Sequence, residues 1–247
     1  MLHRDEAEGV HRIEDAHTNW CLVEDAGRLT VVDTGLPRSW NSLLQALTTL
    51  GRRLGDIDAV VLTHGHFDHM GVARRLQREL GVPVLAHAQE TPVVSHPWRY
   101  DHERPRTPYL LRHPEFRRVF AEMTAMGALW VRGTEAVRAY AAGQRLEVPG
   151  RPIVVPTPGH THGHCALHLP ERGVVLAGDS FVTLDPYTGR HGPCIVAGAA
   201  TADSAEALAS LDALAELDAG VAITGHGPPW RGSLGDAVDR AREAGPA

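Results

Sequence analysis

The sequence contains no lysine, so all 24 of its basic residues are arginine. Its 30 acidic residues outnumber them and give a formal net charge of −6. An acidic chain without a basic stripe is poorly suited to bind nucleic acid or an anionic membrane surface. We therefore expect no nucleic-acid partner and no membrane partner.

Cysteine is scarce as well, and long hydrophobic runs are absent. Cys21, Cys165 and Cys194 lie far apart, which is not the spacing of a disulfide framework, and we expect three small buried side chains. No apolar run reaches the ~18 residues of a membrane span. Residues 1–15 are charged and lack the apolar core of a signal peptide. These features favour a cytoplasmic protein.

The remaining composition, 43% hydrophobic and 22% charged over 247 residues, is that of an ordinary globular protein. A chain of this length buries roughly 70–75% of its extended surface on folding, so it needs neither disulfides nor a structural metal to fold. Because no linker or low-complexity tract interrupts it, we expect a single domain over residues 1–247.

Strands and helices are predicted to alternate in two similar units. The first unit runs from a strand at 31–33 through a helix to 60–66, and the second runs from 174–179 through a helix to 221–226. Polar residues follow the strands of both units. Ligand sites in open α/β sheets gather at the carboxyl ends of strands. Two such units facing each other would place their polar residues along one edge.

Apolar side chains at helical spacing predict three helices in these units. The first begins near Ser39, a candidate N-cap, the second covers about 68–80, and the third covers 204–217. Asp203, with Glu206 three residues later, resembles a capping box at the start of the third helix. The predicted strand 56–62 is apolar on both faces, which indicates a buried strand of a parallel sheet.

Residues 89–145 differ in character from the rest of the chain. Prolines interrupt the first half, and an amphipathic helix is predicted at 115–126. We expect this helical insert to form a pocket wall or lid, with a homodimer contact as the alternative. Its aromatic side chains and arginines could hold an apolar substrate that carries a carboxylate, although we expect Phe116, Phe120 and Met123 to pack the helix onto the body of the protein. The arginines in question are Arg99, Arg104, Arg106, Arg112, Arg117 and Arg118.

Three histidines and an aspartate directly follow the buried strand, in the order His64, His66, Asp68 and His69. Alternate residues of an extended segment project to the same side, so His64 and His66 can point together. Asp68 and His69 can aim at a second point nearby. Imidazole and carboxylate are usual ligands of zinc and also suit iron and manganese. This motif predicts a metal centre.

With this motif the chain resembles the metallo-β-lactamase superfamily of metallo-hydrolases. The resemblance extends from about residue 10 to residue 232. It implies an α/β (α+β) fold, a four-layer αββα sandwich of two pseudo-symmetric halves. The helical insert expected at about 89–145 would interrupt this fold. Five motifs in order carry the resemblance: Asp33 in Val-Asp-Thr-Gly, His64-x-His66-x-Asp68-His69, Pro158-Gly159-His160, Gly178-Asp179 and Gly225-His226-Gly227.

The resemblance also implies two divalent metal ions per chain, most readily Zn²⁺, with iron or manganese as alternatives. One ion would be held by His64, His66 and His160, the other by Asp68, His69 and His226, and Asp179 would bridge the two. Asp33 would orient a ligand imidazole without binding metal itself; a plain turn-forming aspartate is the alternative.

The activity that the resemblance implies is hydrolysis of a small molecule. A hydroxide shared by the two metals would attack the carbonyl of an ester, thioester, lactone or β-lactam-like amide. Asp68 would accept or orient the proton. The alternatives are a small-molecule phosphodiesterase, an iron-dependent oxidoreductase of the dioxygenase type on the same ligands, and a metal-binding protein without catalysis.

Other polar residues near these motifs have less definite roles. His162 stands where related chains often carry proline, and we expect it in solvent. His164 and His168 are expected to be packed or hydrogen-bonded. In the segment after the bridging aspartate, Tyr187 and His191 are candidate proton donors to a leaving group.

Overall fold

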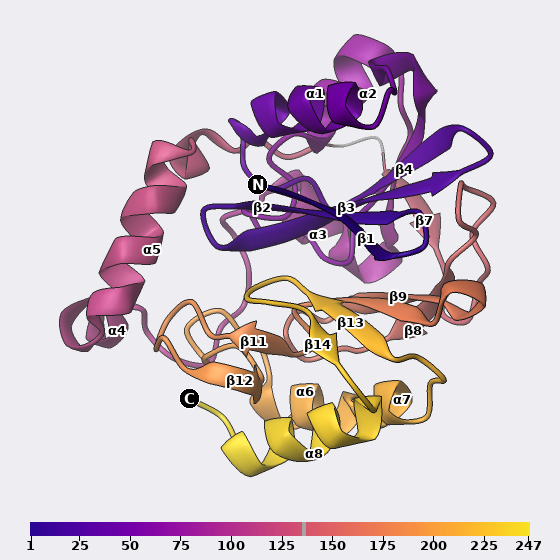
Figure 1. The fold of residues 1–247 in the computed structure, drawn as a ribbon. Helices are drawn as coiled ribbons and strands as arrows, with labels where there is room; N and C mark the ends of the chain where they lie inside the picture. The colour runs from indigo at the N-terminus through magenta and orange to yellow at the C-terminus, as the bar shows by residue number, and fades with distance from the viewer. Residues whose placement is uncertain (135–136) are drawn as a thin grey trace.

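Two β-sheets lie face to face at the centre of the computed structural model, which describes residues 1–134 and 137–247 (Figure 1). Within those ranges the first sheet contains, in order, β1 (Leu2–Ala7), β2 (Val10–Asp15), β3 (Thr18–Asp25), β4 (Arg28–Val32), β5 (Ile57–Val61), β6 (Val84–His87) and β7 (Val137–Tyr140). The second contains, in order, β14 (Trp230–Arg231), β13 (Val221–Thr224), β10 (Val174–Gly178), β9 (Cys165–Leu169) and β8 (Ile153–Pro156). A smaller sheet pairs β11 (Val182–Leu184) with β12 (His191–Cys194).

Helices cover the outer face of each sheet (Figure 1). The first sheet is covered by α1 (Ser39–Thr49) and α2 (Ala73–Leu80), and the second by α6 (Ser204–Ser210), α7 (Asp212–Ala215) and α8 (Leu234–Ala244). The expected insert supplies α3 (Thr91–Ser95), α4 (Thr107–Arg112) and α5 (Pro114–Ala125). Single 3₁₀ turns are η1 (Leu54–Asp56), η2 (Ala88–Glu90), η3 (Ala128–Trp130) and η4 (Pro170–Arg172). α5 stands beside the two sheets rather than over either outer face (Figure 1).

Consecutive valines of β5 show why the layers stack in this way. Val60 belongs to the same hydrophobic core as Leu43 of α1, whereas Val61 belongs to a different core that includes Ile223 of β13 in the second sheet. Successive side chains of a strand point to opposite faces, so a strand that is apolar at both positions is buried on both sides. The predicted burial of this strand is confirmed.

The two predicted units are also present. β4 and β5 are parallel and joined by α1, and β10 and β13 are parallel and joined by α6 and α7. Each unit lies in its own sheet, and its helices lie outside. The αββα sandwich of two related halves is therefore confirmed.

The helix boundaries differ from the prediction at three places. α2 begins at Ala73 rather than residue 68, because backbone hydrogen bonds hold the preceding turn against the loop after β4 (Gly71 N to Gly35 O, 2.7 Å). The third helix is split at Leu211, where Leu214 N donates to Leu211 O in a tighter 3₁₀-type turn.

Ser39 is the third difference. It is the first residue of α1 and not its cap, since its hydroxyl accepts the N–H of Leu36. Asp203 does cap α6, as predicted, by accepting the N–H of Glu206 at 2.8 Å. All three cysteines are buried and free, also as predicted. Within the described ranges, no helix has both the length and the apolar character that crossing a membrane requires.

Candidate metal centre

Asp33 organises the loop that follows β5. Its Oδ1 accepts the N–H of Thr63 and its Oδ2 accepts the Thr63 hydroxyl, both at 2.8 Å. The same Oδ2 lies 3.0 Å from Nδ1 of His69. Asp33 itself has a φ of 55°, an uncommon value for a residue other than glycine. This geometry aims Nε2 of His69 away from Asp33, which agrees with an orienting role and not with a simple turn.

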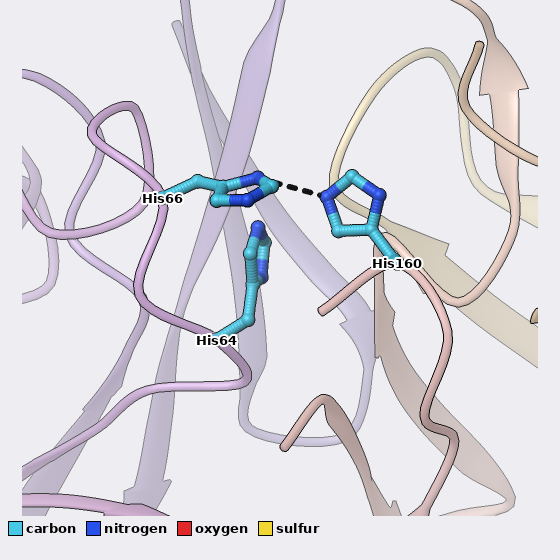
Figure 2. A group of neighbouring side chains, drawn as sticks. All are labelled: His64, His66 and His160. Carbon is cyan, nitrogen blue, oxygen red and sulfur yellow. Dashed lines mark hydrogen bonds between the residues drawn. The ribbon is translucent and has the colours of Figure 1, made fainter. Parts of the chain in front are cut away.

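Three imidazoles from two loops meet beyond the end of β5 (Figure 2). His64 and His66 follow β5, and His160 lies in the loop between β8 and β9. The ligating nitrogens of the three lie within 4.8 Å of one another. Nδ1 of His66 and Nε2 of His160 are 2.9 Å apart. The first predicted ligand group is thus assembled from both halves of the fold.

The second predicted group is assembled in the same way. Ligand atoms of Asp68, His69 and His226 also lie within 4.8 Å of one another, and His226 follows β13 of the second sheet. A third combination, Asp33 with His64 and His69, meets the same distance limit. We do not read Asp33 as a ligand, because Thr63 and His69 already engage its carboxylate oxygens.

Asp179, which follows β10, faces imidazoles of both groups. Its Oδ2 lies 3.4 Å from Nε2 of His160 and 3.3 Å from Nε2 of His226, and its Oδ1 lies 3.7 Å from Nε2 of His69. Gly225 makes this position available, since a Cβ there would lie 1.9 Å from Asp179 Oδ1. The structure therefore brings all seven predicted ligand residues together.

Burial keeps the imidazoles of the first group neutral. It lowers the pKa of His64 and His66 well below the ordinary value and that of His160 to about 4, and neighbouring imidazoles act in the same direction. His164, outside the group, has its pKa lowered by burial to about 3, and its Nε2 accepts the N–H of Asp179. A neutral imidazole offers the lone pair that metal binding requires.

In the second group, nearby carboxylates determine the direction in which the histidine pKa values shift. Although burial opposes the shift, Asp179, Asp68 and Asp33 raise the pKa of His69 to about 10. Burial also opposes the rise at His226, whose pKa is raised mainly by Asp179. Burial disfavours ionised Asp179, yet the facing His226 and His69 hold its pKa well below the usual range. The positive charges favoured on His69 and His226 thus lie around the buried carboxylate of Asp179.

The donor set passes a simple test for cation binding. Nε2 of His64, His66 and His69 and Oδ1 of Asp179 are buried without a hydrogen-bond partner in the described part of the chain. An unsatisfied buried polar group costs about 1–3 kcal/mol, and a cation would satisfy these atoms together. None of the seven residues is more than 6% exposed. Nitrogen and oxygen donors of this kind fit divalent zinc, iron or manganese.

Glu90, at the end of η2, is a site residue that the sequence did not reveal. It is fully buried, its Oε2 accepts the N–H of Gly65 at 2.7 Å, and its Oε1 accepts the N–H of Gly163 at 2.9 Å. Gly65 lies between His64 and His66, so Glu90 joins the two loops that form the first ligand group. An acidic residue three positions after the end of strand β6 was the signal.

An apolar cavity of about 250 Å³ opens onto the candidate centre. Its floor includes His66, Asp68, His160, Asp179 and His226. Its walls are aromatic and aliphatic, and the residues of α5 among them are Phe116, Val119, Phe120 and Met123. The expectation that Phe116, Phe120 and Met123 only pack α5 onto the body is therefore wrong, since all three face the cavity. Met123 also belongs to the core.

The remaining residues considered in the sequence analysis differ in whether they line the cavity. Tyr187 lines the cavity, whereas His191 is exposed and does not. Of the six arginines considered from the insert, only Arg106 lines it. His162 is exposed, as predicted, and pairs with Asp101. His164 is buried and hydrogen-bonded to Thr157, also as predicted.

Comparisons with known proteins agree with this geometry. The family model of the metallo-beta-lactamase superfamily matches residues 13–226. The probable metallo-hydrolase YflN of Bacillus subtilis is 27% identical over 244 residues, which cover 92% of this chain and 86% of that protein.

Solved structures show the same relationship. The metallo-beta-lactamase family protein TTHA1429 of Thermus thermophilus superposes with a TM-score of 0.65 at 30% identity, covering 92% of this chain and 73% of the other. TTHA1623, solved in a di-iron-bound form, superposes with a TM-score of 0.61 at 27% identity over 93% of this chain and 96% of the other. From the matched residues, the shared fold and the assembled motifs we conclude that this chain belongs to the metallo-β-lactamase superfamily.

Proposed function

We propose that this protein is a metal-dependent hydrolase of a small-molecule ester, thioester, lactone or β-lactam-like amide. The observation that carries the proposal is the cluster of seven buried imidazoles and carboxylates, five of which line an apolar cavity. A site of this kind joins a reactive floor to a wall that binds an organic substrate. We further propose that residues 1–247 form one catalytic domain.

The ligand assignment follows from the two groups. His64, His66 and His160 would hold one ion, Asp68, His69 and His226 the other, and Asp179 both. We favour zinc because neutral imidazole and carboxylate are its usual ligands. When bound, a metal pair lowers the pKa of a shared water toward ~7 and polarises a carbonyl oxygen.

Residues of the chain supply the remaining functions. Asp68 lines the cavity, and its carboxylate can accept a proton from the attacking water while Oδ2 faces His226 at 3.5 Å. Burial raises the pKa of Tyr100 to about 12 and that of Tyr187 well above its usual value. Both phenols therefore stay protonated at neutral pH. Tyr187 can donate a hydrogen bond to a leaving group, because its side chain lines the cavity.

Metal analysis combined with turnover tests this proposal. We expect about two zinc ions per chain, turnover of a chromogenic ester, thioester or lactone, loss of turnover with a chelator, and recovery with added zinc. His66→Ala and Asp68→Ala should lose turnover and bind less metal while remaining folded. His162→Ala is the matched control, because this histidine is exposed and outside both groups. Full turnover of the chelated protein or of Asp68→Ala would contradict the proposal.

An iron-dependent oxidoreductase is the second candidate. It is supported by the 27% identical relative that was solved in a di-iron-bound form. Iron in the purified protein together with oxygen uptake, and no ester, thioester or lactone turnover with either metal, would favour this candidate over hydrolysis.

A further inference from the structure

Arg106 is the only arginine that lines the cavity in the part of the chain that the structure describes. Its guanidinium carbon lies 4.7 Å from the centre of the Tyr100 ring, and its Nε donates to the carbonyl oxygen of Ala199 at 3.2 Å. The Tyr100 ring also contacts the His66 ring, at a tilt of 36° and with ring centres 3.8 Å apart. Arg106 and a candidate metal ligand thus contact the same aromatic ring.

The acidic residues near Arg106 in sequence are engaged elsewhere. Asp101 pairs with His162, and Glu103 accepts hydrogen bonds from the N–H and the hydroxyl of Ser204. Across residues 1–134 and 137–247, no carboxylate lies within ion-pair distance of the Arg106 guanidinium. A partly buried arginine normally finds an anionic partner, and its planar fork matches a carboxylate.

The cavity wall defines the rest of the ligand. Phe116, Phe120 and Val119 present an apolar surface from α5, and Phe67 stacks on Trp98 with ring centres 4.0 Å apart. The volume of about 250 Å³ lies just below the range of about 300–1,000 Å³ that is typical of drug-sized ligands. The wall and the volume together fit a small, largely apolar molecule.

Resting on the proposed hydrolysis, we propose that the substrate is a small apolar acyl compound that carries a free carboxylate, and that Arg106 binds this carboxylate. The reacting carbonyl then lies toward Asp68 and Asp179 on the floor, and the apolar body lies along α5. Arg106 acts as a specificity-determining residue: it selects a charged substrate over a neutral one of the same shape.

A matched pair of esters tests the inference. The first is the para-nitrophenyl monoester of adipic acid, and the second is the same ester with a carboxamide in place of the carboxylate. The metal-loaded protein should prefer the carboxylate ester by at least about tenfold in kcat/KM, mostly through KM, because hydrogen bonds to charged groups are the stronger ones. Arg106→Gln should bring the ratio close to one, and Arg106→Lys should restore part of it.

The control is Arg112→Gln, because Arg112 is an exposed arginine of the same insert that does not line the cavity. It should keep the wild-type ratio. Equal turnover of the two esters by the wild-type protein would overturn the inference and leave the hydrolase proposal intact. A preference that persists in Arg106→Gln would also overturn it, because the carboxylate would then bind elsewhere, for instance at the metals.

Binding supplies a readout that does not depend on hydrolysis. The matching phenyl ketones, one with the terminal carboxylate and one with the carboxamide, can be titrated by calorimetry. The wild-type protein should bind the carboxylate at least about tenfold more tightly, and Arg106→Gln should bind both alike. If neither ester is turned over but this binding difference appears, the hydrolase proposal fails on esters and the inference about Arg106 stands. If the difference is absent, the inference is wrong.

Discussion

The carboxylate of Glu90 accepts the backbone N–H of Gly65 at 2.7 Å inside the loop that carries the first two candidate ligands. Its other oxygen accepts the N–H of Gly163 from the second half of the fold. Burial raises the pKa of Glu90, and the two backbone hydrogen bonds oppose this rise. A buried carboxylate with no ion-pair partner among the described residues costs free energy. Its two backbone hydrogen bonds offset part of this cost and join the two loops that carry the proposed ligands.

Replacing Glu90 should therefore loosen the site. In Glu90→Ala the N–H groups of Gly65 and Gly163 lose their acceptor, and each unsatisfied buried group costs about 1–3 kcal/mol. We expect the free energy of unfolding to fall by about 2 kcal/mol or more in urea titrations, and the metal affinity to fall in chelator competition. The control is Glu79→Ala, which removes only an exposed pair with Arg75 and should change stability by less than about 0.5 kcal/mol. Unchanged metal affinity in Glu90→Ala would show that the loops hold their positions without it.

Asp33→Asn tests the orientation of His69. The amide can still accept the N–H of Thr63, but it lacks the charge that faces His69 Nδ1 at 3.0 Å. Changes to groups that orient metal ligands typically cost 10–100-fold in metal affinity or activity. We expect the metal content to fall from about two ions per chain toward one, measured by elemental analysis after dialysis. Two tightly held ions in the variant would refute the orienting role.

Gly225→Ala tests the space beside Asp179. The added methyl group would lie 1.9 Å from Asp179 Oδ1 and 2.8 Å from the His69 ring, so one of these side chains must move. We expect metal affinity to fall at least about tenfold in chelator competition, since both displaced groups are proposed ligands. Gly220→Ala is the matched control because a Cβ there meets nothing within 4 Å. Equal affinities of the two variants would contradict the proposed ligation by Asp179.

Stability should depend on pH through His11, which lies in β2 away from the candidate centre. Burial lowers its pKa despite Asp5 and Glu24, and its neutral Nδ1 accepts the N–H of Asp5. Since the folded pKa is depressed, this contribution is present above the unfolded value of 6.5 and is lost as pH falls through the folded value. The free energy of unfolding should therefore fall as the pH drops below 6.5, and His11→Gln should show a smaller fall. A parallel fall in both proteins would exclude His11 as a source.

The seven proposed ligand residues were chosen through the family resemblance of their motifs. The structure brings them together because each follows a strand end or lies in a glycine-flanked turn. Glu90 could not be predicted, because its role depends on a loop that lies 73 residues further along the chain. β1 and β2 were missed because residues 1–15 are rich in charge. Arg12 is nevertheless buried there, since it pairs with Glu6 and Glu14. Cytoplasmic location, the dimer contact and the choice of zinc stay predictions.

Arg106 is a second residue whose role the sequence alone could not predict. The sequence offered six arginines in the insert, and only the path of the chain around α4 selects Arg106. The other arginines do not line the cavity. Arg117, for example, donates to backbone carbonyl oxygens at the end of α4, and Arg118 pairs with Glu115. Composition shows that cations are present, whereas tertiary contacts decide which of them meets a ligand.

Both candidate ligand groups draw on side chains from each sheet, since His64, His66 and His69 follow β5 while His160 and His226 belong to the second half. An ion bound at either group would therefore link the two halves of the fold. Separation of the two halves would then require release of that ion. Metal binding should thus slow hydrogen exchange in both halves of the fold, including strands far from the ligand loops. It should also make both halves more resistant to proteases.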